Sequence, residues 1–292
     1  MKKITVNIIN AFSSNNTGGN PAGVVLDADN LTSTDKLHVA RAVGLSETAF
    51  VSKSNQADFK LDFFTPTKQI PHCGHATIAT FSYLKQQGII SGDKSSKETI
   101  DGVRQIFFEG EDAFMEQGSP VELPLAALDR DNSLRALQLE ESDLLQGYEP
   151  AIISTGNNFL IVPVKSQDYL ERMQPDLAMI EAISATYNLI AFYVYAPSEL
   201  KGVIATTRMF GPYYGIPEEA ATGMAAGPLA CFLDRHQSVK PNHMEIAQGY
   251  FMNPPSPSRI KVRLQKSNGH IEKVFAGGGA FVSRQLTVQI KD

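Results

Sequence analysis

The chain has 292 residues, of which 42% are hydrophobic and 20% charged, so it can build one large globular domain or two ordinary ones. Its net charge of -5 and its lack of a basic run argue against nucleic acid as a partner. Two cysteines are too few for a disulfide framework, and no apolar run approaches the ~20 residues of a membrane span, so we expect a cytoplasmic protein with no membrane partner.

The first elements alternate between extended and helical patterns. Residues 3–12 read as a strand, a loop rich in Gly and Asn follows at 13–23, and extended structure resumes at 24–26. Such a loop offers backbone N–H groups to a ligand, although a plain connection explains it equally well. Ser33 or Thr34 is expected to cap a helix that runs to about Val43 and ends at Gly44.

Glu47 lies directly after this helix, at the entrance of a strand made of apolar residues. A carboxylate beside apolar neighbours could have a raised pKa and could therefore act as both acid and base. A solvated glutamate at the end of a strand is the alternative, and the local sequence by itself favours it.

The segment from Phe63 to Leu84 is the most informative stretch. A strand at 59–64 leads through two prolines to Cys73, Gly74 and His75, and a helix with almost no charge follows. Gly74 lets a ligand approach the backbone, and the helix start offers N–H groups and a positive dipole end to a carboxylate. Since this helix has no clear polar face, we predict that a sheet wraps around it. A core helix with a satisfied histidine is the alternative.

The remaining elements follow the same patterns. Strands are expected at 98–108 and 113–115, and the polar segment 122–143 is interpreted as a connector with some helix and therefore as the domain boundary. Gly277-Gly278-Gly279 is expected to form a tight turn. Beyond the boundary we predict strands at 159–164, 190–195, 203–210, 260–264, 271–275 and 280–290, and a helix at 176–187.

The second half repeats the order of the first. Pro66 and Pro212 each follow a strand and are half a chain length apart, and an uncharged helix comes after each. The two halves therefore resemble copies, each with strands around one buried helix. If both helix starts point into a shared cleft, Glu47, His75 and Glu219 would face a small substrate bearing a carboxylate. That arrangement suits proton transfer on carbon without a cofactor.

Other chemistries fit the sequence less well. The chain lacks a Gly-rich loop that ends in Gly-Lys-Ser/Thr, and Gly277-Gly278-Gly279 precedes a strand and not a helix, so nucleotide binding is unsupported. His72, Cys73 and His75 are close in sequence, but a second ligand cluster at metal spacing is missing, so we expect no metal site. A nucleophilic pair of Cys73 and His75 stays open, although side chains so near in sequence need not face each other.

A set of ordered motifs covers nearly the whole chain. Together these motifs resemble the PhzF-like isomerase family of phenazine biosynthesis, which is related in fold to diaminopimelate epimerase and proline racemase. The motifs are Gly19-Asn20-Pro21-Ala22-Gly23, Gly44-Leu45-Ser46-Glu47-Thr48-Ala49-Phe50, Phe64-Thr65-Pro66 with Cys73-Gly74-His75-Ala76-Thr77, Ser154-Thr155-Gly156, Ala221-Thr222-Gly223 and Gln248-Gly249.

The resemblance implies an α+β fold with two similar domains, each a curled mixed or antiparallel sheet, an open barrel, around a central buried helix. We assign residues 1–125 to the first domain, to which the strand 280–292 could return, and 126–279 to the second. The family further implies a homodimer, an active site between the domains, and no metal or organic cofactor.

The resemblance also implies roles for individual residues. Glu47 would be the general acid and base, a proton shuttle between carbons, and His75 and Glu219 would be its catalytic partners. These assignments outweigh the solvated and structural alternatives given above. The substrate, a small molecule with a carboxylate, would be bound by Asn20, Cys73, Gly74, Thr222 and Gly223.

The chain departs from the family pattern at several places. Glu219 stands where an aspartate is usual, Met224 replaces a serine, and Gln69 stands where glutamate is common. Asn253-Pro254-Pro255-Ser256 replaces the usual Gly-Arg-Pro-Ser. These changes leave the fold prediction intact and bear on the substrate and on activity.

Two further functions compete with the isomerase. One is an amino-acid racemase or epimerase that uses Cys73 with a partner other than a thiol, because Ala220 occupies the place of the second cysteine in the related epimerases. The other is a small-molecule-binding protein without activity, which Glu219 and Met224 favour. Cys231 lies two helical turns further along and is expected to belong to the core.

Overall fold

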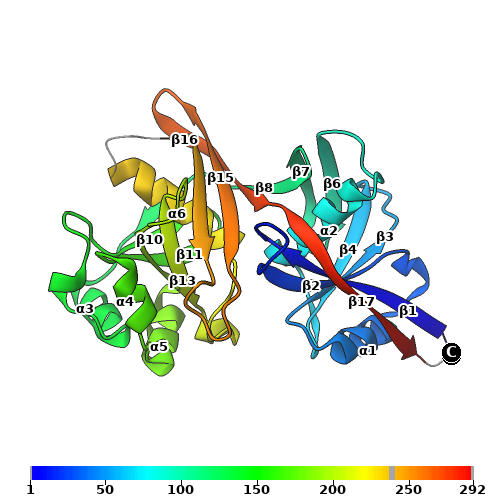
Figure 1. The fold of residues 1–292 in the computed structure, drawn as a ribbon, viewed down its shortest axis with the longest axis horizontal. Helices are drawn as coiled ribbons and strands as arrows, with labels where there is room; N and C mark the ends of the chain where they lie inside the picture. The colour runs from blue at the N-terminus through cyan, green and yellow to red at the C-terminus, as the bar shows by residue number, and fades with distance from the viewer. Residues whose placement is uncertain (1, 237–240, 291–292) are drawn as a thin grey trace. The chain divides into compact units, whose positions relative to one another are not determined.

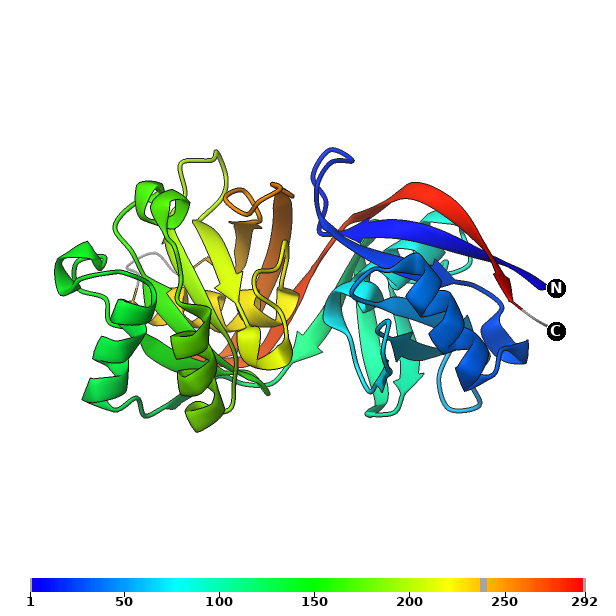
Figure 2. The ribbon, with the colours of Figure 1, turned by 90° about the horizontal axis from the view of Figure 1, so that it is seen from below.

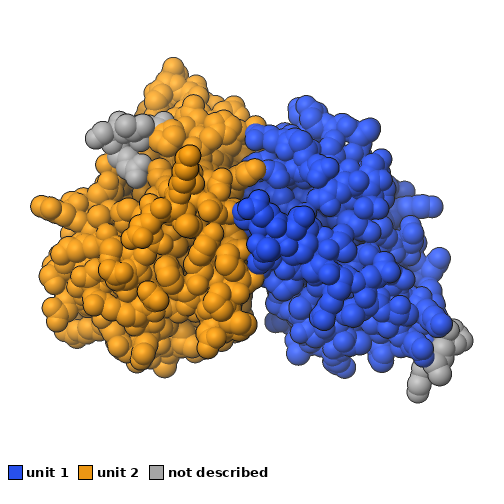
Figure 3. All heavy atoms as spheres, viewed as in Figure 1, with its two compact units in different colours: residues 1–115, 277–292 blue, residues 116–276 orange. Residues whose placement is uncertain are grey.

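The computed structural model describes residues 2–236 and 241–290, which divide into two compact units (Figure 1). Figure 3 shows unit 1, residues Met1–Met115 and Gly277–Asp292, in blue and unit 2, residues Glu116–Ala276, in orange. The predicted strand 280–292 groups with unit 1, although its last two residues lie outside the described part. Among the described residues, the helices are all too short or too polar to cross a membrane.

Unit 1 is built on a mixed sheet around its first strand. Strand β1 (Lys2–Ala11) pairs antiparallel with β2 (Asn20–Val25) and with β17 (Ala280–Ile290), which lie side by side with it in Figure 2. Strand β2 continues in parallel to β3 (Thr48–Ser52), and β3 continues antiparallel to β4 (Phe59–Phe64). The sheet is completed by β5 (Gln69–Ile70), β6 (Lys94–Thr99), β7 (Gly102–Glu109) and β8 (Asp112–Gln117).

Helix α2 (Gly74–Gln86) is the central helix of unit 1. It packs against β1, β2, β3 and β17, and all its residues from His75 to Ser82 are buried. A helix with an apolar surface on most sides is stable only when other elements cover it, which is the reason for this position.

Helix α1 (Ser33–Val43) covers an apolar cluster of unit 1 that includes Val6, Phe50 and Phe64. It ends at Gly44 as expected. Its cap is Thr32 and neither of the two predicted residues, because Thr32 and Asp35 form a reciprocal capping box.

Unit 2 is also a mixed, strand-rich unit with one buried helix. Helix α6 (Gly223–His236) packs against β10, β11 and β15 and is buried from Ala225 to Asp234. The uncharged helix predicted after Pro212 is this helix. The strands are β9 (Val121–Leu123), β10 (Ala151–Ser154), β11 (Asn158–Pro163), β12 (Leu189–Pro197), β13 (Ala205–Phe210), β14 (His243–Gln248), β15 (Ser258–Ser267) and β16 (His270–Gly278).

Three smaller helices of unit 2 cover an apolar cluster on the sheet, which includes Ile152, Leu160 and Phe192. They are α3 (Ala127–Ala136), α4 (Gln167–Arg172) and α5 (Leu177–Tyr187). Short 3-10 turns occur in the described chain at Ala28–Asn30, Glu141–Asp143 and Pro212–Tyr214.

The glycines at 277–279 do not form the predicted turn. Strand β16 continues through Gly278 and β17 begins at Ala280, so the chain stays extended here. The glycines instead permit close approach, since a Cβ at Gly277 would lie 2.1 Å from the carbonyl oxygen of Ala113 and one at Gly279 would lie 2.8 Å from Asp112 Oδ1.

Two further expectations differ from the structure. The strand predicted at 98–108 is a hairpin of β6 and β7, with Gly102 in the left-handed region at a φ of 96°. Strand β14 and helix α4 were not predicted, because each is only six residues long and gives a weak periodic signal.

Candidate active site

Glu47 lies one residue before β3, where its backbone is fixed by β2. The N–H of Gly23 donates to the carbonyl of Glu47 at 3.0 Å, and Gly23 pairs with Thr48. A Cβ at Gly23 would lie 2.8 Å from Thr48 Oγ1, so glycine is required for this close pairing. The side chain of Glu47 is 15% exposed, so its carboxylate is largely enclosed by protein.

Cys73 and His75 come from the start of α2. Cys73 is the N-cap residue in extended conformation, and its carbonyl accepts from Thr77 Oγ1 at 2.6 Å. This bond fixes the first turn of the helix. Cys73 and His75 are both buried, each with 7% of its surface exposed.

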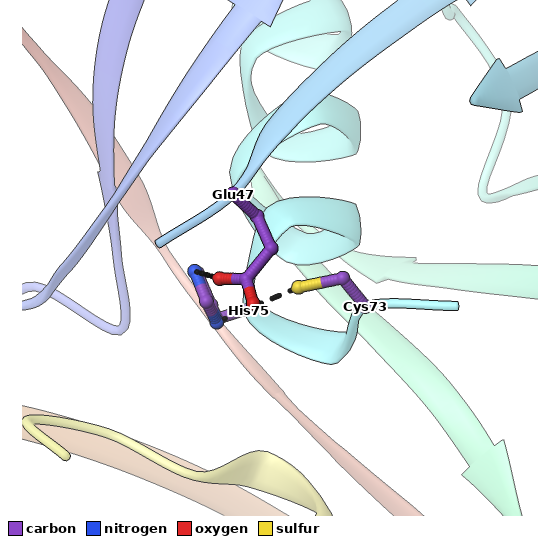
Figure 4. Close-up of side chains that lie close together, drawn as sticks. All are labelled: Glu47, Cys73 and His75. Atoms are coloured by element: carbon purple, nitrogen blue, oxygen red, sulfur yellow. Dashed lines mark hydrogen bonds and ion pairs between the residues drawn. The ribbon is translucent and has the colours of Figure 1, made fainter. Parts of the chain in front are cut away.

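Figure 4 shows the side chains of Glu47, Cys73 and His75 gathered at the start of α2, where the imidazole contacts both of the others. His75 Nε2 lies 3.3 Å from Glu47 Oε2, and His75 Nδ1 lies 3.6 Å from Cys73 Sγ. The two side chains of the helix start therefore do face each other, which the sequence could not establish. The contact of His75 with Cys73 has the geometry of a hydrogen bond, whereas its contact with Glu47 is an ion pair when the imidazole is protonated.

The same three groups include donor types that bind metals, and their ligand atoms lie within 4.8 Å of one another. The imidazole, however, directs a different nitrogen to each neighbour. An ion bound through one nitrogen would displace at least one of these contacts. A metal ion at this place would therefore require these side chains to rearrange.

Lys97, on β6, is fully buried behind the start of α2. Its Nζ donates to Thr77 Oγ1 at 2.6 Å and lies 3.1 Å from Nδ1 of His72. Burial lowers the pKa of Lys97 to about 7; a thiolate at Cys73 opposes this lowering, and Arg104 adds to it. Burial also lowers the pKa of His72, to about 3, with the charge of Lys97 as the second cause.

In unit 2, Glu219 is held in the segment that precedes α6. Its Oε2 accepts from Thr222 Oγ1 at 3.0 Å. Gln248 is fully buried behind this segment and donates from Nε2 to the Glu219 carbonyl at 2.7 Å and to Thr222 Oγ1 at 3.1 Å. Its Oε1 accepts from the Thr222 N–H and from Tyr193. The oxygen and the nitrogen of this amide thus both hold the segment that precedes α6.

Gly223 begins α6, and its carbonyl accepts from Gln117 Nε2 at 2.9 Å. Met224 follows it and is partly buried, with its Sδ 3.7 Å from Asn157 Nδ2. A serine at this place could offer a hydroxyl to a substrate, whereas the thioether is only a weak acceptor.

The other expected residues lie as follows. Asn20 begins β2 opposite Ala11 and is 5% exposed. Gln69 donates to Asp62 Oδ1 at 3.3 Å. Cys231 is in the core, as expected, and burial raises its pKa to about 12, so its thiol stays protonated at neutral pH.

The structure thus brings together Glu47, Cys73 and His75 in unit 1, and Glu219 with Thr222 in unit 2. The sequence did not point to Lys97, because its strand β6 (Lys94–Thr99) is polar throughout and has no apolar residue to mark an inward face. It offered Gln248 as part of a motif but without a role.

Known proteins are similar to this chain over most or nearly all of its length. The family model described as PhzC-PhzF, phenazine biosynthesis-like protein, matches residues 9–285. An uncharacterized isomerase of Clostridium acetobutylicum is 34% identical over 99% of each chain. A trans-2,3-dihydro-3-hydroxyanthranilate isomerase of Pseudomonas chlororaphis is 34% identical over 85% of this chain and 87% of that protein.

A crystal structure of a Bacillus anthracis phenazine biosynthesis protein of the PhzF family superposes with a TM-score of 0.88. It is 29% identical and covers 99% of this chain and 100% of its own. The mixed, strand-rich fold is therefore shared over the full length. With the family model and the near full-length relatives in agreement, the chain belongs to the PhzC-PhzF family of phenazine biosynthesis-like isomerases.

Proposed function

We propose that the protein is a cofactor-independent isomerase that moves a proton between two carbon atoms of a small substrate bearing a carboxylate. Glu47 is the general acid and base in this proposal. The observation that carries it is the largely enclosed Glu47 carboxylate, 3.3 Å from His75 at the start of α2.

The proton transfer needs a group that can both take and return a proton. The Glu47 carboxylate removes a proton from one carbon, becomes a carboxylic acid, and delivers the proton to another carbon. His75, as an imidazolium ion, would pair with this carboxylate and keep it directed at the substrate. The first N–H groups of α2, at Gly74 and His75, would hold the substrate carboxylate at the positive end of the helix dipole.

Residues of unit 2 would contribute substrate contacts. Glu219 and Thr222 are fixed by Gln248, and Gly223 offers its backbone at the start of α6. Asn20 and Cys73 would complete the contacts in unit 1. The active site between the domains that the sequence led us to expect stays a prediction.

Relatives suggest where a substrate search should begin. The relative from Pseudomonas chlororaphis is named for trans-2,3-dihydro-3-hydroxyanthranilate, a carboxylate that also carries an amine and a hydroxyl. The longer Glu219 and the missing hydroxyl at Met224 change how such groups would be bound. We therefore infer a substrate of the same chemical class but of different shape.

Exchange of substrate hydrogen with solvent deuterium tests the proposal. The protein is incubated in deuterated buffer with that compound and with other small unsaturated or amino carboxylates, and magnetic resonance follows deuterium at carbon. Wild type is expected to label one compound, and Glu47→Gln to label it more slowly by on the order of 10² or more. Glu111→Gln changes an exposed turn glutamate and should behave as wild type. Labelling by Glu47→Gln at the wild-type rate would refute the proposal.

A second candidate function is favoured by one contact. Cys73 Sγ lies 3.6 Å from His75 Nδ1, which is the arrangement of a thiol activated by an imidazole. A racemase or epimerase of this kind would lose activity in Cys73→Ser and retain it in Glu47→Gln. The isomerase proposed above should instead lose activity in Glu47→Gln and retain it in Cys73→Ser, so the pair of variants separates the two functions.

The homodimer implied by the family resemblance is also proposed. Light scattering during gel filtration should give twice the mass of the 31.8 kDa chain. A mass of one chain across the working concentration range would contradict it.

A further inference from the structure

Strand β6 turns an unusual face toward the interior of unit 1. Its inward residues are Ser95, Lys97 and Thr99, all of them polar and all buried. An inward strand position normally carries an apolar side chain, and burial of a lysine costs free energy because the ammonium ion loses its water. Lys97 therefore requires an explanation beyond packing.

The neutral groups around Lys97 do not balance its charge. Its Nζ donates to Thr77 Oγ1, lies 3.1 Å from His72 Nδ1, and lies 5.2 Å from the centre of the Phe63 ring. None of the ion pairs formed within residues 2–236 and 241–290 includes Lys97. A buried charge is stable only when an opposite charge or strong hydrogen bonds compensate it. The ammonium ion of Lys97 would therefore favour a negative charge placed nearby.

Lys97 is connected to the start of α2 in two ways. Thr77 accepts from Lys97 and donates to the Cys73 carbonyl at 2.6 Å, and His72 directly precedes Cys73. The ammonium group thus supports the first turn of α2 from behind, and its charge adds to the positive end of the helix dipole.

We propose that Lys97 is a positioning residue, whose buried ammonium group fixes the start of α2 and stabilises negative charge there, on Cys73 or on a substrate carboxylate. The proposal rests on the proposed function only in placing a substrate carboxylate at this helix start. Because the charge on Cys73 can be measured without turnover, the role of Lys97 and the isomerase function can be refuted independently of each other.

The charge state of Lys97 depends on every group that faces it. These are His72 and Cys73 at the helix start, Thr77 on α2, Phe63 on β4, and Asp101 and Arg104 from the β6–β7 hairpin. Burial is the largest effect on the pKa of Lys97, and a thiolate at Cys73 is the next and acts in the opposite direction. By thermodynamic reciprocity, an ammonium ion at Lys97 must favour the Cys73 thiolate equally.

The test measures the pH at which Cys73 ionises, from the ultraviolet absorbance of the thiolate. Cys231 does not interfere, because burial raises its pKa to about 12. In Lys97→Met, which keeps the length and removes the charge, the midpoint should move upward by about one pH unit or more. An unchanged midpoint would overturn the proposal.

Two matched variants separate charge from structure. Lys97→Arg retains the charge and should restore a midpoint near that of wild type. Thr77→Val removes the hydroxyl bridge and keeps the ammonium group, so its midpoint should stay closer to wild type than that of Lys97→Met. Equal shifts in Thr77→Val and Lys97→Met would show that only the local structure matters, and would reject a role for charge.

A converse measurement decides the matter even if Lys97→Met does not fold. In wild-type protein that carries ¹³C-labelled lysine, magnetic resonance should reveal one lysine that titrates near neutral pH. In Cys73→Ser that titration should move to lower pH, because the thiolate that favours the ammonium ion is gone. An identical titration in both proteins would refute the coupling.

Discussion

His72 illustrates how a single buried side chain makes stability depend on pH. In the folded state its pKa is about 3, because burial and then the charge of Lys97 disfavour the imidazolium ion. The unfolded chain regains the ordinary value of 6.5 and therefore binds a proton that the folded state does not. The contribution of His72 is thus intact above pH 6.5 and is lost as the pH falls toward 3.

We predict that His72→Gln flattens this part of the pH dependence. The free energy of unfolding of wild type should fall more steeply between pH 6.5 and 4 than that of the variant, because only wild type loses the His72 contribution. Urea titrations at several pH values within that interval measure the difference. His38→Gln, at an exposed position, should give a curve parallel to wild type. Parallel curves for His72→Gln would contradict the assignment.

Sequence reasoning at the residue scale worked where several motifs agreed. Glu47, Cys73 and His75 were singled out, although nothing yet tests their roles, and the structure brings their side chains together. The contact between Cys73 and His75 was left open, because it depends on side-chain directions in the first turn of a helix. Lys97 could not be found, since its burial follows from the pairing of β6 with β4 and β7 and not from its neighbours in sequence.

Between elements, Gln248 connects three parts of unit 2. It lies at the end of β14, accepts from Tyr193 on β12, and binds the segment before α6 through Glu219 and Thr222. Burial raises the pKa of Tyr193, so its hydroxyl remains a donor at neutral pH. The entrance of α6 is therefore held by side chains of the sheet.

We predict that Gln248→Leu destabilises unit 2 and impairs function. The Thr222 N–H and the Tyr193 hydroxyl would lose their acceptor, at a cost of roughly 1 to 3 kcal/mol for each buried group. Thermal unfolding and steady-state kinetics measure the two effects, and the loss of kcat/KM should exceed the loss of folded protein. Gln265→Leu, at an exposed position of β15, is the matched control. Equal behaviour of both variants would argue against a role for Gln248.

Patterns in the sequence identified the long elements more reliably than the short ones. Strand β4 has the predicted bounds, and α1 and α5 agree to within one residue, because apolar periodicity and end signals agree there. The glycines at 277–279 were misinterpreted, since glycine marks a close approach as readily as a turn. Which of the two applies depends on the distant segment at Ala113, and local sequence cannot show that.

At the scale of the whole chain, unit 1 is assembled from both ends of the sequence. Strand β17 pairs with β1 along its length, from Lys2 opposite Ile290 to Ala11 opposite Ala280. Val288 and Ile290 are buried in the apolar cluster beneath α1. Strand pairing and core packing thus both tie the end of the chain to unit 1.

We predict that removal of residues 280–292 unfolds unit 1, whereas a circular permutant that joins residue 292 to residue 1 folds. The permutant keeps both strands and connects ends that are adjacent, since Lys2 lies opposite Ile290. New ends can be placed at Gly110, in an exposed turn. Circular dichroism and hydrogen exchange report the folding of each protein. A folded truncated chain with wild-type protection of β1 would contradict the prediction.

The sequence suggested one part of the whole-chain organisation, namely two similar halves with one buried helix each. Similar motif order in the two halves led to one buried helix in each, and α2 and α6 have that place in their units. The domain bounds 1–125 and 126–279 stay a prediction. Residues 116–125 group with unit 2, and polar composition alone does not show on which side of a connector a boundary falls.

The most direct test of the account is the transfer of solvent deuterium to carbon by Glu47→Gln and by Cys73→Ser, side by side with wild type, on a carboxylate that wild type labels. If Glu47 is the general acid and base, Glu47→Gln should be slower by on the order of 10² to 10⁴, while Cys73→Ser keeps most of the rate and both variants unfold at the wild-type temperature. A Glu47→Gln protein that labels the compound as fast as wild type would contradict the account.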